Sequence, residues 1–341
     1  SKVLGTKRDA DAFDAEVRRR KRTGELRTLD AGKQVLSDFA EEWWQLHAVP
    51  NLAPRTLEVY AGIWDRHVLP RLGSMPLRDL TPEVIVRFRA ELAADRVGNA
   101  SALKALALLQ GVLQRAVEWQ RIPANPVRGV RKPPQARTLV LSPPSPRQVE
   151  RMRASLLARD RVRDATLVCV LAYAGLRPGE ALALEWRHVG ERAFLIDGSV
   201  SLGERKETKT RQKRSVRILG PVAEDVARWR NVSAHGSSRD PVFPNAEGGL
   251  WSEHDYRNWR RRVYQPAAAL AGVTGSRPYD LRHAFASLLI AEGRSIVDIA
   301  IQLGHSPTMT LSTYAHLVEE LEGRKRRTAA DVIRAARRSS G

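Results

Sequence analysis

Two short segments near the end of the chain carry arginine, histidine and tyrosine side chains at regular spacings. In RPYDLRHAFASLL, Tyr279, Arg282 and His283 stand at positions i, i+3 and i+4, which share one face of a helix. Leucines and a phenylalanine of the same segment form a neighbouring apolar stripe, so packing is expected to hold the polar cluster rigidly. In LGHSPTMTLSTYAHL, His305 lies on a predicted tight turn and Tyr314 on the helix that follows.

A third segment, AYAGLRPGEALAL, places Arg177 at an elbow between two helices, marked by Gly175, Pro178 and Gly179. Arginines stay charged at any working pH and bind two phosphate oxygens at once. A phenol has a pKa of about 10 and is a weak nucleophile at pH 7. If these side chains meet in the fold, they could support attack of a tyrosine on a phosphodiester, with arginines stabilising the negative charge that develops on the phosphate.

Taken singly, each of these residues also fits an ordinary structural role. Tyr314 lies on an apolar helical face and fits a core position. Arg177 can cap a helix, and His305 follows a glycine and can be a turn residue. Lys209 is one of many charges in the segment GERKETKTRQKRS. The order of the motifs along the chain is more specific than any one of them.

In that order the motifs resemble those of the tyrosine recombinases, or phage-type integrases. GLRPGEALAL resembles the family's first arginine box, KETKTRQKRSVRI its catalytic lysine hairpin, and DLRHAFAS its second box. LGHS resembles the family's histidine box, and TLSTYAHL resembles its nucleophile segment. Tyr314 follows His305 by nine residues, as the family pattern expects. The resemblance covers roughly residues 140–320. It implies strand cleavage and rejoining through a 3′-phosphotyrosyl intermediate, with these catalytic residues: Arg177, Lys209, Arg282, His305 and Tyr314.

One position departs from the family pattern. The second box usually begins with His or Lys, where this chain has Tyr279. A tyrosine can donate a hydrogen bond to a phosphate oxygen but carries no positive charge. Tyr279, His283 and Glu180, the acidic residue after the first arginine, are therefore expected as accessory residues of the site.

The composition indicates a nucleic-acid partner. The 341 residues include 57 Lys+Arg against 38 Asp+Glu, a formal net charge of +19. A basic soluble enzyme with a solvated surface is the alternative. Cys169 is the one cysteine, within an apolar run too short to span a membrane, and no signal peptide is visible. These features favour a cytoplasmic protein, and the resemblance to phage-type integrases implies a bacterial or phage origin. No P-loop, dinucleotide fingerprint, HExxH motif or Cys/His cluster is present, so neither nucleotide hydrolysis nor zinc chemistry is indicated. Carboxylate-bound magnesium needs no tight motif and stays open, but the expected reaction requires no cofactor or metal.

The chain divides into five expected segments. We expect an N-terminal helix in 1–32, the remnant of an arm-type DNA-binding domain, and a helical core-binding domain in 33–122. A basic Pro-rich linker in 123–146, a catalytic domain in 147–318 and a tail in 319–341 complete the chain. The tail is expected to dock on a neighbouring protomer, and a tail folded on its own domain is the alternative. The fold is expected to be mainly α. Short strands (RAFLID, GSVSL and SVRIL) should form a small β-sheet and hairpin within an α+β catalytic domain.

The resemblance implies that the partner is double-stranded DNA at attachment or junction sites, bound by a homotetramer with accessory DNA-bending or directionality factors. Phosphate contacts are expected from basic residues of the hairpin, the RNWRRR segment and the linker: Arg205, Lys206, Arg211, Arg257, Arg260, Arg261, Arg131 and Lys132. Two other functions remain open at this point. One is a type IB topoisomerase, which shares the chemistry, and the other is a non-catalytic DNA-binding protein on the same fold.

Overall fold

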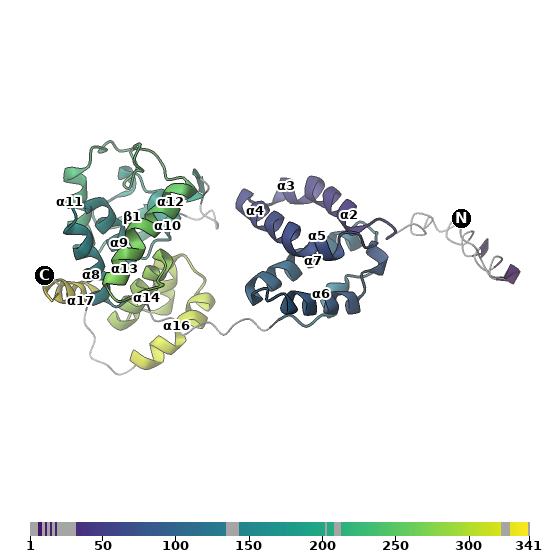
Figure 1. The fold of residues 1–341 in the computed structure, drawn as a ribbon. Coiled ribbons are helices and arrows are strands. Elements are labelled where there is room, and N and C mark those ends of the chain that lie inside the picture. Colours follow the sequence, from purple (N-terminus) through teal and green to yellow (C-terminus); the bar gives the residue numbers. More distant parts are fainter. Residues whose placement is uncertain are drawn as a thin grey trace. The chain divides into compact units, whose positions relative to one another are not determined.

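The computed structural model describes residues 32–133, 143–201, 203–207, 213–321 and 328–339, together with positions 6–8, 11, 14, 15 and 18. Most of the expected N-terminal helix therefore lies outside the described residues. The chain forms two compact units, residues 1–139 and 140–341, each with its own hydrophobic core (Figure 1). No helix in the described ranges is long and apolar enough to cross a membrane.

The first unit is a four-helix bundle, which confirms the helical domain expected there. Its first two helices each continue through a π-helical turn into a short further helix. The helices are α2 (Leu36–Trp43) leading to α3 (Val49–Asn51), α4 (Pro54–Ile63) leading to α5 (Leu69–Leu72), α6 (Pro82–Ala94) and α7 (Asn99–Glu118). One face of α7 is buried along its whole length, and it packs with Phe39 and Phe88 in the core. The sequence forms this bundle because each helix carries one apolar stripe.

The bundle extends further along the chain than expected. Asn125 accepts a hydrogen bond from the backbone N–H of Val127 and donates to the carbonyl of Gln110, and a 3₁₀ turn follows at Pro126–Gly129. Val127 and Val130 are buried in the core of the bundle. The first prolines of the expected linker thus belong to the folded unit, because apolar residues between them pack on α7. Residues 134–142 lie outside the described range.

The second unit is built around α9 (Val162–Tyr173), whose last ten residues are all buried. Figure 1 shows the other helices of the unit gathered around it, and α8, α10, α11 and α14 contact it directly. Cys169 lies on α9 as a buried free thiol. The helices around α9 are α8 (Pro146–Leu157), α10 (Pro178–Leu182), α11 (Gly220–Val232), α12 (Glu253–Trp259), α13 (Gln265–Leu270), α14 (Leu281–Glu292), α15 (Ile296–Leu303), α16 (Pro307–Leu321) and α17 (Ala329–Arg338).

Two small antiparallel sheets complete this unit, as the sequence predicted. In one sheet β1 (Ala193–Ile196) pairs with β4 (Arg214–Arg217), and in the other β2 (Gly198–Ser201) pairs with β3 (Glu204–Glu207). The β2–β3 hairpin lies against α10, where a side chain at Gly179 would collide with the backbone of Val200. Lys209 and Arg211 follow β3 in the chain and lie outside the described residues.

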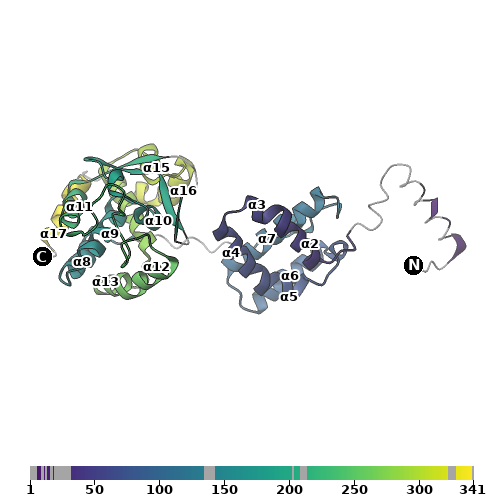
Figure 2. The ribbon, with the colours of Figure 1, turned by 90° about the horizontal axis from the view of Figure 1, so that it is seen from above.

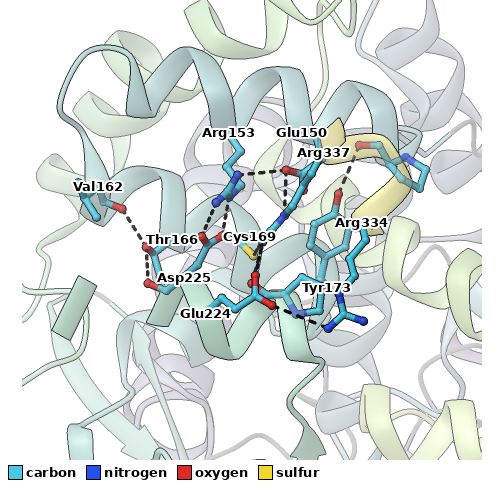
Figure 3. A network of polar contacts seen from close by, with 12 residues as sticks. Glu150, Arg153, Val162, Thr166, Cys169, Tyr173, Glu224, Asp225, Arg334 and Arg337 are labelled. Atoms are coloured by element: carbon cyan, nitrogen blue, oxygen red, sulfur yellow. Dashed lines mark hydrogen bonds and ion pairs between the residues drawn. The ribbon is translucent and has the colours of Figure 1, made fainter. Parts of the chain in front are cut away.

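Helix α17 packs on its own unit, against α8, α11 and α14; Figure 2 shows it beside α8 and α11. The tail was expected to dock on a neighbouring protomer, whereas its helix α17 packs on the same chain. The contact includes a buried acidic pair, Glu150 and Asp225, which binds both Arg153 and Arg337 (Figure 3). Arg337 lies 3.0 Å from Asp225 and 3.3 Å from Glu150.

The pKa values of the two carboxylates in this acidic pair shift in opposite directions. Burial tends to raise both pKa values. Hydrogen bonds and charge from Arg153, with the charge of Arg337, outweigh burial at Asp225 and lower its pKa. At Glu150 burial outweighs the same two arginines, so its pKa is raised. Asp225 is therefore the anion that holds Arg337 most firmly.

We predict that Arg337→Met lowers the free energy of unfolding by about 3 kcal/mol, because it leaves a buried carboxylate pair one cation short. Urea unfolding at pH 7 measures the change. The matched control is Arg334→Met on the same helix, since Arg334 is half-exposed and lies 3.8 Å from the exposed Glu224. The control should cost at most about 0.5 kcal/mol. Equal effects of the two variants would contradict a special role for Arg337.

Candidate active site

The elbow after α9 fixes the first predicted arginine. Gly175 has a φ of +62°, and a Cβ there would lie 2.4 Å from the ring of Phe285, so both conformation and space require glycine. Arg177 then precedes α10 as its N-cap residue. Its guanidinium donates to Glu180 at 2.7 Å and to the carbonyl of Gly304 at 3.1 Å. The elbow thus brings Arg177 to a loop more than a hundred residues away in sequence.

Glu180 is the centre of this ion-pair cluster. It is buried and accepts hydrogen bonds from Arg177 and, at 2.7 and 3.0 Å, from both terminal nitrogens of Arg214. Arg282 lies 3.9 Å away. Burial alone would raise the pKa of Glu180, but the bonds and charges of Arg214 and Arg177 lower it to about 2. Glu180 is therefore an anion at any working pH and fixes the arginines around it.

Sequence reasoning missed Arg214. It is one of several basic residues in RQKRS, and only its place as the first residue of β4 distinguishes it. Its Nε donates to the carbonyl of Gln302 at 3.2 Å, and its guanidinium lies 3.1 Å from the position a Cβ on Gly304 would take. Arg214 thus ties the β1–β4 sheet to the loop after α15.

Arg282, near the start of α14, is completely buried. Its guanidinium donates to the carbonyls of Gly175 (2.6 Å) and Leu303, and to Nε2 of His305 at 3.0 Å. Burial, followed by the nearby charge of Arg177, lowers its pKa to about 10. It remains charged at neutral pH, while its Nε has no hydrogen-bond partner among the described residues.

His305 follows Gly304, which ends α15 with a φ of +62°. Arginine has no lone pair to accept a hydrogen bond, so Nε2 of His305 must be the acceptor in its bond with Arg282. Neutral His305 therefore carries its proton on Nδ1, which is buried and has no partner in the described part of the chain. Burial, with the charges of Arg282 and Arg177, lowers its pKa to about 4, so the neutral form prevails.

Tyr314 lies on α16 with its side chain fully buried. Its hydroxyl is 2.6 Å from Nδ1 of His283, the residue after Arg282 on α14. Burial raises the pKa of Tyr314 to about 12, against a smaller opposing effect of Arg282. Tyr279 is 37% exposed, and its ring contacts that of His283 edge-on at 5.7 Å. The tyrosine hydroxyl therefore lies against the residue that follows Arg282 on α14.

The structure thus brings together most of the residues expected at the site. Arg177, Arg282 and His305 meet around the backbone carbonyls at the end of α15, and Tyr314 contacts His283, the residue next to Arg282 on α14. Lys209 lies outside the described residues. Within the described ranges, no three His, Cys, Asp or Glu side chains gather in a way that could hold a metal ion.

The expected DNA-contact residues fall into two groups. Arg205 forms ion pairs with Asp197 and Glu185, and Lys206 lies 3.3 Å from Glu204, so both are already paired within the protein. Arg211 lies outside the described residues. The others are exposed on the surface: Arg131, Lys132, Arg257, Arg260 and Arg261.

The unpaired atoms of the cluster indicate which ligand it can take. Nε of Arg282 and Nδ1 of His305 are both buried donors without an acceptor. A buried donor left unpaired costs about 1–3 kcal/mol. Three guanidinium groups also surround one carboxylate, Glu180, which leaves an excess of positive charge. An oxyanion such as a phosphate would supply both the acceptors and the missing negative charge.

Comparison with known proteins agrees with this arrangement. A model of the phage integrase family matches residues 145–320, and a model of the phage integrase N-terminal SAM-like domain matches residues 35–93. The chain belongs to the phage integrase family. Members of this tyrosine recombinase family cleave and rejoin DNA strands, so the protein is an enzyme of site-specific DNA recombination.

Two relatives illustrate the extent of the similarity. A tyrosine recombinase XerC from Methylobacterium nodulans is 30% identical over 307 residues, which cover 83% of this chain and 89% of the relative. A putative prophage phiRv2 integrase from Mycobacterium tuberculosis is 26% identical over 359 residues, covering 96% and 87%. The similarity thus includes both structural units.

Solved structures show the same fold. The Tn1549 transposon integrase in complex with a circular intermediate DNA superposes with a TM-score of 0.71, at 17% identity, over 83% of this chain and 95% of that one. A lambda integrase tetramer bound to a Holliday junction gives a TM-score of 0.62, at 15% identity, over 90% and 89%. The mainly helical fold with small antiparallel sheets is therefore that of the integrases.

We predict that Glu180→Gln destabilises the protein in a pH-dependent way. The folded-state pKa of about 2 lies below the ordinary 4.5, so ionised Glu180 contributes about 3 kcal/mol of stability at neutral pH. This contribution is fully present above pH 4.5 and is lost as the pH falls toward 2. The gap in unfolding free energy between wild type and variant should therefore narrow over that range.

Urea unfolding at pH 7 and at pH 3 measures the gap. Glu191→Gln, which replaces an exposed carboxylate before β1, is the control and should change stability little at either pH. A gap for Glu180→Gln that is the same at both pH values would contradict the role of its charge.

Proposed function

We propose that Tyr314 is the nucleophile of this recombinase and forms a 3′-phosphotyrosyl link with the cleaved DNA strand. The observation that carries the proposal is the pair of unpaired buried donors, Arg282 Nε and His305 Nδ1, together with the contact of the Tyr314 hydroxyl with His283, the residue after Arg282. The reaction integrates or excises a mobile element, as the names of the prophage and transposon relatives suggest.

In the proposed reaction the scissile phosphate binds to the arginine cluster. Arg177 and Arg282 contact its non-bridging oxygens, and His305 donates from Nδ1. As Tyr314 Oη bonds to phosphorus, the bond from phosphorus to the 5′-oxygen breaks, and Lys209 gives the leaving oxygen a proton. Preorganised donors of this type are worth about 3–4 kcal/mol each in the transition state.

The covalent intermediate makes an external energy source unnecessary. The phosphotyrosyl bond keeps the free energy of the broken phosphodiester. A 5′-hydroxyl from the exchanged strand then attacks phosphorus, and Tyr314 leaves as the DNA is resealed. Neither a cofactor nor a metal is needed for this sequence of steps.

The proposed substrate is duplex DNA at attachment or junction sites. Arg257, Arg260 and Arg261 on and after α12 are exposed and are proposed to contact phosphates. Arg131 and Lys132, exposed after the helical bundle, are proposed to do the same. Because a lambda integrase tetramer binds a Holliday junction, we propose that four protomers of this chain assemble on two duplexes. Accessory DNA-bending or directionality factors are further proposed partners.

We predict that Tyr314→Phe abolishes the covalent adduct while leaving DNA affinity within about twofold, because only the nucleophilic oxygen is removed. The assay uses a nicked suicide duplex with the element's own junction sequence and detects a denaturant-resistant protein–DNA band. A band that persists in Tyr314→Phe would move the nucleophile to another residue.

The same assay separates the alternatives. Tight binding without any wild-type adduct would favour a non-catalytic DNA-binding protein on this fold. Adducts on arbitrary sequences, without tetramer assembly, would favour a type IB topoisomerase. The match of residues 35–93 to the integrase SAM-like domain supports the recombinase.

We predict that replacing Arg260 and Arg261 together with glutamine flattens the salt dependence of DNA binding. Each lost phosphate contact reduces the slope of log K against log salt by about 0.9, so the slope should change by about 1.8. Affinity measured from 50 to 200 mM salt tests this. The control is Arg334→Gln, which removes an exposed positive charge on α17, a helix that is not among the proposed DNA contacts. An unchanged slope in the double variant would remove these two residues from the DNA interface.

A further inference from the structure

The Tyr314 hydroxyl makes its hydrogen bond to a residue that the family motifs do not require. Nδ1 of His283 is 2.6 Å from Tyr314 Oη, and both side chains are buried, at 8% and 0% exposure. Their rings lie 5.7 Å apart. His283 follows Arg282 on α14, so one rigid helix carries both a ligand for the phosphate and the contact to the nucleophile.

The other candidates for accepting the phenolic proton are engaged or unsuited. Nε2 of His305 already accepts from Arg282, and its Nδ1 carries the proton, so neutral His305 has no free lone pair. Tyr279 occupies the slot where the family usually has His or Lys, and a phenol is a poor base at neutral pH. Among the described residues, His283 is the hydrogen-bond partner of the Tyr314 hydroxyl.

We propose that His283 is the general base that removes the proton from Tyr314 during cleavage. The Tyr314 Oη–phosphorus bond forms while the proton moves from Oη to Nδ1 of His283, and the bond to the 5′-oxygen breaks with a proton from Lys209. In resealing, the 5′-hydroxyl gives its proton to Lys209 and attacks phosphorus, and His283 returns its proton to the leaving Oη. Protons and electron pairs balance in both directions. This inference rests on the proposed role of Tyr314.

The charges around His283 suit this task. Burial lowers the pKa of His283, and the nearby positive charges of Arg282 and Arg277 act in the same direction, against the carboxylate of Asp280. The imidazole is therefore neutral at pH 7, and in the tautomer protonated on Nε2 its Nδ1 lone pair faces the phenol. Because burial also raises the pKa of Tyr314, the phenol does not ionise alone, and its proton must move as the new bond forms.

The hydrogen bond could instead act as a latch, since it holds a nucleophile that is fully covered in the DNA-free chain. The two roles predict opposite effects of removing the imidazole. Loss of a general base slows cleavage by about 10²–10⁴-fold. Loss of a latch leaves the cleavage rate unchanged or raises it.

The experiment measures single-turnover cleavage of the nicked suicide duplex by the full-length protein. His283→Ala and His283→Gln should both form the Tyr314 adduct at least about 100-fold more slowly than wild type, with DNA affinity unchanged. Glutamine keeps a hydrogen-bond acceptor but cannot take up a proton. Added imidazole should raise the rate of His283→Ala at least tenfold through the space left by the side chain, and should leave His283→Gln unchanged.

The matched control is Ser287→Ala, one turn further along α14, whose hydroxyl donates to the backbone carbonyl of His283. It should cleave at the wild-type rate, which shows that small changes to this helix are tolerated. Wild-type rates in the two His283 variants, faster cleavage, or no response of His283→Ala to imidazole would each overturn the inference. If wild type itself forms no adduct at Tyr314, the proposed function fails as well, so the two failures are distinguishable.

Discussion

The gathering of three arginines, one of them completely buried, around one buried carboxylate is the constraint on which the site depends. Glu180 holds Arg177 and Arg214 in direct ion pairs and Arg282 at 3.9 Å. A lone carboxylate cannot neutralise three guanidinium groups, and buried charges are costly unless they are paired. Part of this cost is offset because Arg282 donates hydrogen bonds to the backbone carbonyls of Gly175 and Leu303. The remaining positive charge and the remaining donors favour an anion, which is the property that phosphoryl transfer requires.

The fold supports this constraint through two glycine turns and one central helix. Gly175 and Gly304 both adopt left-handed φ values and lie where a helix ends. The turn at Gly175 positions Arg177, and the carbonyls of both glycines accept hydrogen bonds from arginines of the site. Helix α9 lies at the centre of the unit and holds the first turn, while α14 brings Arg282 and His283 against it. Because these helices are buried on most sides, the site residues have little freedom to move independently of one another.

The sequence predicted the parts of the site that are encoded locally. Arg177, Arg282, His305 and Tyr314 stand in short motifs whose glycines, spacing and apolar stripes are visible in the chain. The structure brings the first three together, and Tyr314 contacts the neighbour of Arg282, His283. Arg214 was not predicted because its partner, Glu180, is 34 residues away and nothing near Arg214 in sequence marks the pairing. Arg205 was predicted to contact DNA, yet it pairs with Asp197 and Glu185.

Long-range contacts also explain why the sequence did not predict where the helical bundle ends or where α17 packs. The prolines after residue 122 suggested a linker, but Val127 and Val130 pack in the bundle, and only tertiary structure reveals such packing. The packing of α17 depends on the ion pairs of Arg337 with Glu150 and Asp225. These two acidic residues are 75 positions apart, and nothing in the sequence near either one indicates that they form a pair. Local motifs identified the chemistry, whereas long-range ion pairs had to come from the structure.

The two histidines of the site show how the neighbours of a side chain determine its role. Both are kept neutral, since burial lowers the pKa of each. His305 is bonded to an arginine, which can only donate, so its Nε2 must accept and its Nδ1 becomes a donor suited to a phosphate oxygen. His283 is bonded to a phenol, which can give up a proton, so its Nδ1 can act as an acceptor. In the proposed reaction, the same kind of side chain would therefore act as an oxyanion donor at His305 and as a base at His283.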